Sequence, residues 1–143
     1  MNGFLLDTMV MSEGTKPRPN RGLSSWLATV DESSTYISVF TIGELHKGIA
    51  LLDARLPRRA ELERWLTFEL IGRFGRRILA FNTNVARHWG AMLASSLPRG
   101  TKLSVVDSQI AATASLYRLK VVTRNERHFE PTGIGTFNPW TRS

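Results

Sequence analysis

The chain has 143 residues, 42% of them hydrophobic and 22% charged, which is the size and mix of one globular domain with its own core. It contains no cysteine, so disulfides and thiolate metal sites are excluded and a metal would need oxygen or imidazole ligands. The net charge is +7, and arginine supplies 15 of the 19 basic side chains. Because guanidinium matches phosphate geometry, this excess favours a polyanionic partner, with a solvated basic surface as the alternative.

Strand and helix signals alternate along the chain. Short apolar or β-branched runs predict strands, and apolar residues at three- and four-residue spacing predict helices. In chain order we expect a strand at 3–6, a loop rich in Gly, Pro and Asn at 13–20, a helix at 21–31, a strand at 36–39, a helix at 41–52, a longer helix at 57–74, a strand at 77–81, a helix at 83–97, a helix that has residue 107 in its first turn and runs to 117, a strand at 119–123 and an edge strand at 134–137.

This alternation predicts an α/β fold with right-handed crossovers and a mainly parallel sheet sandwiched by helices. In such folds ligands gather at the carboxyl ends of the strands. Asp7 ends the first strand, and Glu44 and Asp107 open helices close behind strand signals. Asn125 and His128 follow the fourth strand. We therefore expect these side chains to meet at one edge of the sheet.

Three carboxylates, those of Asp7, Glu44 and Asp107, lie at the ends of apolar runs. Burying an ionised carboxylate without compensation costs on the order of several kcal/mol. Three such positions suggest a shared metal, and oxygen ligands favour Mg²⁺ or Mn²⁺. Divalent ions held in this way activate water and neutralise the charge that builds on a scissile phosphate. The cluster therefore indicates metal-assisted phosphodiester cleavage.

Each acid also has a purely structural interpretation. Thr41 and Glu44 fit a capping box, and Ser104 and Asp107 fit the same pattern. Asp7 can cap the turn that follows it. The two interpretations are compatible, because the helix dipole favours a carboxylate in the first turn while the same side chain serves a metal.

Four segments match a known family: Phe4-Leu5-Leu6-Asp7-Thr8, Gly43-Glu44-Leu45, Val106-Asp107-Ser108-Gln109-Ile110-Ala111-Ala112-Thr113-Ala114 and Val122-Thr123-Arg124-Asn125. They resemble the PIN-domain family, and more narrowly the VapC/FitB-type toxins of bacterial toxin-antitoxin pairs. The resemblance covers essentially the whole chain, so we expect residues 1–143 to form a single PIN-like domain. The segment around Asp107 is its most specific part.

The resemblance implies a Rossmann-like three-layer sandwich and a Mg²⁺- or Mn²⁺-dependent ribonuclease that hydrolyses RNA with a metal-activated water. It also implies a homodimer or a larger complex, and a cognate antitoxin that inserts into the site and carries any contact with DNA. Asp7, Glu44 and Asp107 match the family's acidic metal ligands. Thr8 and Thr123 match its polar site positions.

Two features depart from the family pattern. The family usually reads Asp-Thr-Asn near the start, whereas Met9 stands third here and cannot hydrogen-bond a metal-bound water. The fourth acid is missing, since Asn125 occupies one family position for it and His128 the other. As a catalytic residue Asn125 can still orient a water, and His128 can ligate a metal when neutral or contact phosphate when charged. With fewer negative ligands, a second ion should bind weakly or only with substrate phosphate.

These departures keep a second hypothesis open, in which a weakened or inactive PIN-like module binds antitoxin or nucleic acid without cleaving it. A phosphatase of another α/β fold is disfavoured, because Met9 stands where such enzymes commonly carry a second Asp. The sequence offers no signal peptide or membrane-spanning run, which predicts a cytoplasmic protein with no membrane partner. The basic residues Arg73, Arg76 and Arg77 could follow an RNA backbone, with a solvated helix face as the alternative.

Overall fold

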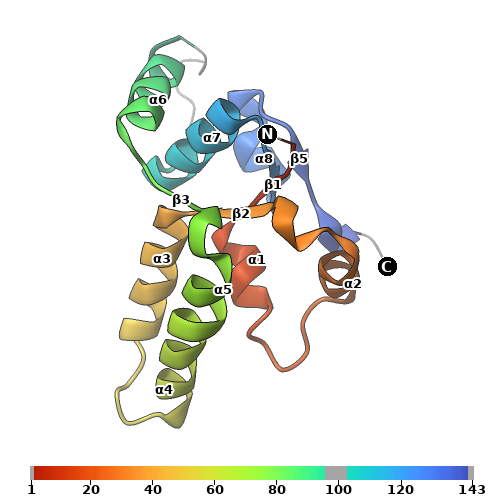
Figure 1. Cartoon of the computed structure of the whole chain (residues 1–143), viewed down its shortest axis with the longest axis vertical. Coiled ribbons are helices and arrows are strands. Elements are labelled where there is room, and N and C mark those ends of the chain that lie inside the picture. Colours follow the sequence, from red (N-terminus) through yellow and green to blue (C-terminus); the bar gives the residue numbers. More distant parts are fainter. Residues whose placement is uncertain (1, 96–102, 142–143) are drawn as a thin grey trace.

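Five short parallel strands form the centre of the structure, a computed structural model that describes residues 2–95 and 103–141 (Figure 1). The strands are β1 (Phe4–Leu6), β2 (Thr35–Ser38), β3 (Ile78–Leu79), β4 (Lys120–Val122) and β5 (Thr136–Phe137). They lie in the order β3-β2-β1-β4-β5, and each neighbouring pair is parallel. The predicted parallel sheet is therefore confirmed, with the first strand at its centre.

Helices cover both faces of this sheet, which gives the three layers expected from the sequence (Figure 1). One face carries α1 (Thr8–Glu13), α2 (Arg21–Thr29), α3 (Val39–Ala50), α4 (Pro57–Arg64) and α5 (Gly72–Phe74). The other face carries α6 (Thr83–Ser95), α7 (Val105–Tyr117) and α8 (Glu126–Phe129). In the described part of the chain, no helix is both long enough and apolar enough to cross a membrane.

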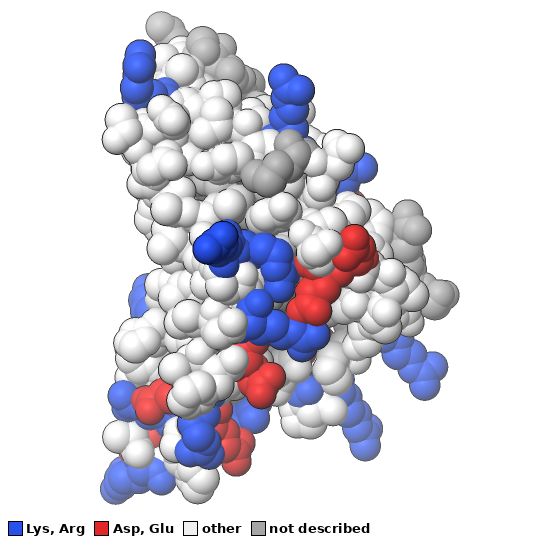
Figure 2. Space-filling model, viewed as in Figure 1, with Lys and Arg blue, Asp and Glu red and all other residues white. Residues whose placement is uncertain are grey.

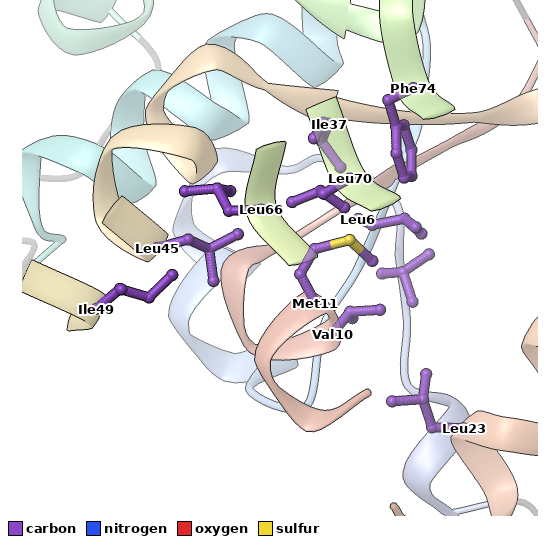
Figure 3. Close-up of a cluster of buried hydrophobic side chains, with 11 residues drawn as sticks. Leu6, Val10, Met11, Leu23, Ile37, Leu45, Ile49, Leu66, Leu70 and Phe74 are labelled. Atoms are coloured by element: carbon purple, nitrogen blue, oxygen red, sulfur yellow. The ribbon is translucent and has the colours of Figure 1, made fainter. Parts of the chain in front are cut away.

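Two hydrophobic cores lie on the two faces of the sheet. Neighbouring residues of a strand point to opposite faces, so Leu5 packs in one core and Leu6 in the other. Val121 and Val122 divide between the cores in the same way. Figure 3 shows the core that contains Leu6, where side chains from α1, α2, α3 and α5 converge. Because both faces of the sheet are buried, the register in which β1 pairs with β4 is strongly determined, and with it the level at which the two strands end.

The helix predicted at 57–74 is confirmed, with a change of helical register in its middle. Pro57 stands in the first turn of α4, where its missing N–H is harmless. A π-helical segment, Trp65–Ile71, then leads into α5. Leu66 and Leu70 of that segment are buried in the core that contains Leu6. Figure 1 shows α4 and α3 side by side, extending away from the sheet.

The starts of the helices differ in part from the predictions. The capping box at Thr41 is wrong, because α3 begins two residues earlier and Ser38 is its N-cap, accepting from the Phe40 N–H at 3.1 Å. The cap of α7 is confirmed, since the Asp107 N–H donates to Ser104 Oγ at 3.0 Å. Helix α1 follows β1 directly and has no counterpart among the predicted elements. The predicted end of the helix at 83–97 lies outside the described residues.

Arg77 connects the end of the long helix to the start of β2. Its Nη1 donates to the carbonyl oxygens of Glu32 and Thr35 at 2.8 and 2.9 Å. Its guanidinium lies 4.5 Å from the centre of the Phe74 ring, and Arg73 pairs with the Glu32 carboxylate. Arg77 is thus mostly buried and bonded within the protein, whereas the Arg73 side chain is 63% exposed beside Glu32. The hypothesis that these arginines follow an RNA backbone stays a prediction. Figure 2 shows acidic side chains interspersed among the basic ones on this face.

Substituting Arg77 with Ala should lower the free energy of unfolding by about 2 kcal/mol, because the carbonyls that it serves lose a charged donor. Arg77→Lys should recover only part of this loss, since an ammonium group does not reproduce the planar fork. The neighbouring, exposed Arg76→Ala is the matched control. Urea unfolding measures all three variants. Equal stability of the Arg77→Ala and Arg76→Ala proteins would contradict this role.

Candidate metal centre

A pocket of about 200 Å³ opens at the carboxyl ends of β1 and β4. Its lining includes every site residue predicted from the sequence: Asp7, Thr8, Glu44, Asp107, Thr123, Asn125 and His128. Met9, Ile110 and Phe129 complete the lining. β1 and β4 are neighbours in the sheet but far apart in the sequence, so the pocket lies where the strand order changes direction, as in other open parallel sheets.

Strand pairing places Asp7 beside Thr123. Leu6 lies opposite Val122, and the Asp7 N–H donates to the Val122 carbonyl at 3.1 Å. The next residues, Asp7 and Thr123, therefore leave the sheet at the same level. Asp7 Oδ1 also accepts from the Val10 N–H at 3.1 Å as the N-cap of α1. The structural interpretation of Asp7 is thus confirmed alongside its place in the pocket.

The Asp7 carboxylate is buried without a cationic partner. Only 8% of the residue is exposed, and no Lys or Arg among the described residues forms an ion pair with it. Burial raises the pKa of Asp7 to about 6, and the nearby negative charge of Asp107 adds to the rise. Hydrogen bonds from the Thr123 side chain and the Val10 N–H act in the opposite direction. A buried carboxylate in this state fits a site that binds a cation.

Glu44 and Asp107 reach the pocket from two helices. Glu44 lies on α3, and its Oε1 accepts from Thr8 Oγ1 at 2.5 Å. Thr8 is the residue after Asp7, so the hydroxyl ties α3 to the end of β1. Asp107 lies in the first turn of α7, where the helix dipole favours its negative charge. Three carboxylates from distant parts of the sequence therefore line one pocket.

The three carboxylates taken alone fit a divalent ion that keeps water ligands better than an ion enclosed on all sides by protein. Within residues 2–95 and 103–141, no three acidic or histidine side chains converge closely enough to enclose a metal. The carboxylates instead line an open pocket, and Mg²⁺ in proteins commonly retains several waters and takes only one or two carboxylates. The residues present therefore suit an ion whose remaining ligands are water or substrate oxygens.

The positions that depart from the family pattern also lie in the pocket. Asn125 Nδ2 donates to the Met9 thioether at 3.2 Å, and the Asn125 N–H donates to Thr123 Oγ1 at 3.0 Å. His128, on α8, has its Nδ1 3.9 Å from Asp107 Oδ2. The sequence did not predict the Met9–Asn125 contact, because Met9 on α1 and Asn125 at the N-cap of α8 are far apart in the sequence and meet only in the folded chain.

Two apolar residues of the pocket were absent from the sequence prediction. Ile110 lies one turn beyond Asp107 on α7, and Phe129 follows His128. Both are 2% exposed. Their position in the sequence, close to polar residues that were predicted to form the site, was the signal by which they could have been found. Apolar walls lower the local dielectric and strengthen electrostatic interactions in the pocket.

The parallel sheet, the acidic pocket at its switch point and the helices on both faces define a PIN-type α/β protein. The model of the PIN domain matches residues 4–133, and the chain belongs to this family. It is 35% identical to the toxin FitB of Neisseria gonorrhoeae over 137 residues, covering 96% of this chain and 98% of FitB. It is 32% identical to the VapC ribonuclease Y4jK of Sinorhizobium fredii over 96% of this chain and 97% of that protein.

A solved structure gives the same result at the level of the fold. FitAB bound to the IR36 DNA fragment superposes with a TM-score of 0.89 at 31% identity, covering 98% of this chain and 97% of the matched chain. The three-layer arrangement expected from the resemblance is therefore confirmed.

Asp7→Asn should stabilise the metal-free protein above pH 6. The folded state raises the pKa of Asp7 from 3.8 to about 6, so ionisation of the carboxylate destabilises the fold. Asn keeps the N-cap acceptor without the charge. In chelator at pH 8 the variant should gain up to about 3 kcal/mol of unfolding free energy, and the gain should shrink as the pH falls through 6 towards 4. Thermal unfolding at pH 8 and pH 4.5 measures this. A variant less stable than wild type at pH 8 would contradict the assigned burial cost.

Proposed function

We propose that the protein is a Mg²⁺- or Mn²⁺-dependent endoribonuclease and the toxin of a bacterial toxin-antitoxin pair. The observation that carries the proposal is the convergence of Asp7, Glu44 and Asp107 on one pocket at the switch point of a PIN-domain sheet. The names of its relatives, toxin FitB and VapC ribonuclease Y4jK, support the same activity and biological role.

The three carboxylates would hold the metal, and the neutral polar residues around them would set its surroundings. A divalent ion bound there supplies an activated water and neutralises charge on the scissile phosphate. Thr8 orients Glu44 through its hydroxyl, and the Thr123 side chain hydrogen-bonds Asp7. Asn125, which bonds to Thr123 and Met9, would help to position the attacking water.

The proposed partners follow from the family and the charge of the chain. A net charge of +7 suits binding of RNA, whose phosphates attract Arg and Lys. One chain of the structure of FitAB bound to a DNA fragment resembles this chain over nearly its whole length. We therefore expect a cognate antitoxin to bind this protein, to occupy the acidic pocket, and to supply the contacts with DNA. A homodimer, or a larger complex with antitoxin, is the expected assembly.

A second function, binding of antitoxin or nucleic acid without cleavage, is favoured by one observation. In the described part of the chain the acidic side chains do not close into a metal cage, and Asn125 and His128, neither of them a carboxylate, stand at the two family positions for a fourth acid. A weak metal site would leave the fold and its partners intact while removing catalysis. Cleavage assays separate the two functions.

Purified protein should cleave a mixed RNA pool in Mn²⁺ or Mg²⁺ and lose this activity in chelator. Asp107→Asn should reduce cleavage by about a hundredfold or more, because it removes the charge of a metal ligand. Asp53→Asn removes the same charge from an exposed position outside the pocket and should retain activity. Gel analysis of labelled RNA measures the rates, and thermal unfolding verifies that each variant folds. Absence of cleavage by the wild type at every metal concentration would favour the binding module.

A further inference from the structure

We propose that His128 is a metal ligand and makes this pocket prefer transition-metal ions over Mg²⁺. The inference rests on the proposed function, because it requires a divalent ion among the pocket's carboxylates. It assigns to His128 a role in choosing the ion, which the three acids alone do not provide.

The geometry places His128 within reach of an ion bound to Asp107. The separation of His128 Nδ1 and Asp107 Oδ2 is 3.9 Å. Two ligands that each lie about 2.1 Å from one ion stand at most about 4.2 Å apart. The observed separation is therefore short enough for one ion to lie between the two atoms.

The surroundings of the imidazole leave it available for a ligand. Its side chain is 62% exposed, and the one polar interaction seen for it among the described residues is with Asp107. His128 also faces the same pocket as Asp7 and Glu44, so an ion there would meet oxygen donors on one side and a nitrogen donor on the other. A ring this exposed and this close to an acidic cluster has no structural task in the core.

Donor chemistry then decides which ion gains most. Mg²⁺ binds oxygen almost exclusively, whereas imidazole is a good ligand for first-row transition metals, whose affinities rise along the Irving–Williams order. An imidazole ligand also brings no negative charge to the site. Mg²⁺ depends more strongly than a transition-metal ion on negatively charged ligands. Replacing an acid by His128 should therefore weaken Mg²⁺ binding relative to Mn²⁺ and Co²⁺.

Ligation of the metal by His128 can be tested by spectroscopy, because the chain has only three histidines and each can be replaced in turn. Mn²⁺ is the probe, and pulsed electron paramagnetic resonance detects coupling to a ligating imidazole nitrogen. The proteins are prepared without a polyhistidine tag. The wild type and the His46→Gln and His88→Gln variants should all show this coupling. His128→Gln should lose it. His46 is exposed on α3, and His88 Nε2 lies 2.9 Å from Ser115 Oγ, so neither belongs to the pocket.

Metal titrations provide the second readout. His128→Gln should weaken Mn²⁺ binding by about tenfold or more and change Mg²⁺ binding less. His128→Asp should shift the preference towards Mg²⁺, because it restores an oxygen ligand and a charge. Calorimetry of the three proteins with each metal alone gives the six dissociation constants needed, and RNA is not required.

The outcomes separate this inference from the function on which it rests. If wild type binds Mn²⁺ without nitrogen coupling, or if His128→Gln binds Mn²⁺ more tightly, His128 competes for Asp107 instead of ligating the ion. The inference is then overturned while the nuclease proposal stands. If wild type binds no divalent ion at all, both fall together. Nitrogen coupling that disappears only in the His128→Gln protein supports the assignment.

Discussion

β1 is hydrogen-bonded on both sides, to β2 and to β4, and the functional geometry depends on its pairing with β4. The register that sets Leu6 opposite Val122 brings Asp7 and Thr123 to the same level, although they are separated by most of the chain. A shift by one residue would move Leu5 and Leu6 to the wrong cores and turn Asp7 away from the pocket. Packing of the two hydrophobic cores therefore determines the positions of the pocket residues as well as the fold.

The buried acid is a cost that the fold carries for its function. Asp7 is almost wholly shielded from solvent, and its raised pKa means that the charged form is disfavoured there. Thr123 and the cap of α1 compensate only part of this cost through neutral hydrogen bonds. A divalent cation would remove the remainder. Stability of the apo-protein and affinity for metal are thus expected to oppose each other at this one side chain.

Sequence reasoning predicted the long elements and the members of the site, and it failed where short-range side-chain geometry decides. The helix at 57–74 has apolar residues at helical spacing from Leu62 to Leu70, whereas the six residues of α1 are too few for a periodic pattern. Thr41 matched a capping box, yet β2 ends directly in Ser38, which takes the cap. Polar residues after strands located the pocket, but the Thr8–Glu44 and Asn125–Met9 contacts depend on the folded arrangement.

We propose that the carboxylates of Asp7 after β1, Glu44 on α3 and Asp107 on α7 provide the ligands of one divalent-ion site. The measurement that tests it most directly is anomalous X-ray scattering from crystals of the protein grown with Mn²⁺. The account predicts a strong peak in the pocket between Asp7 and Asp107, within coordination distance of their oxygens. An empty pocket at saturating Mn²⁺, or a peak held by residues elsewhere on the surface, would contradict it.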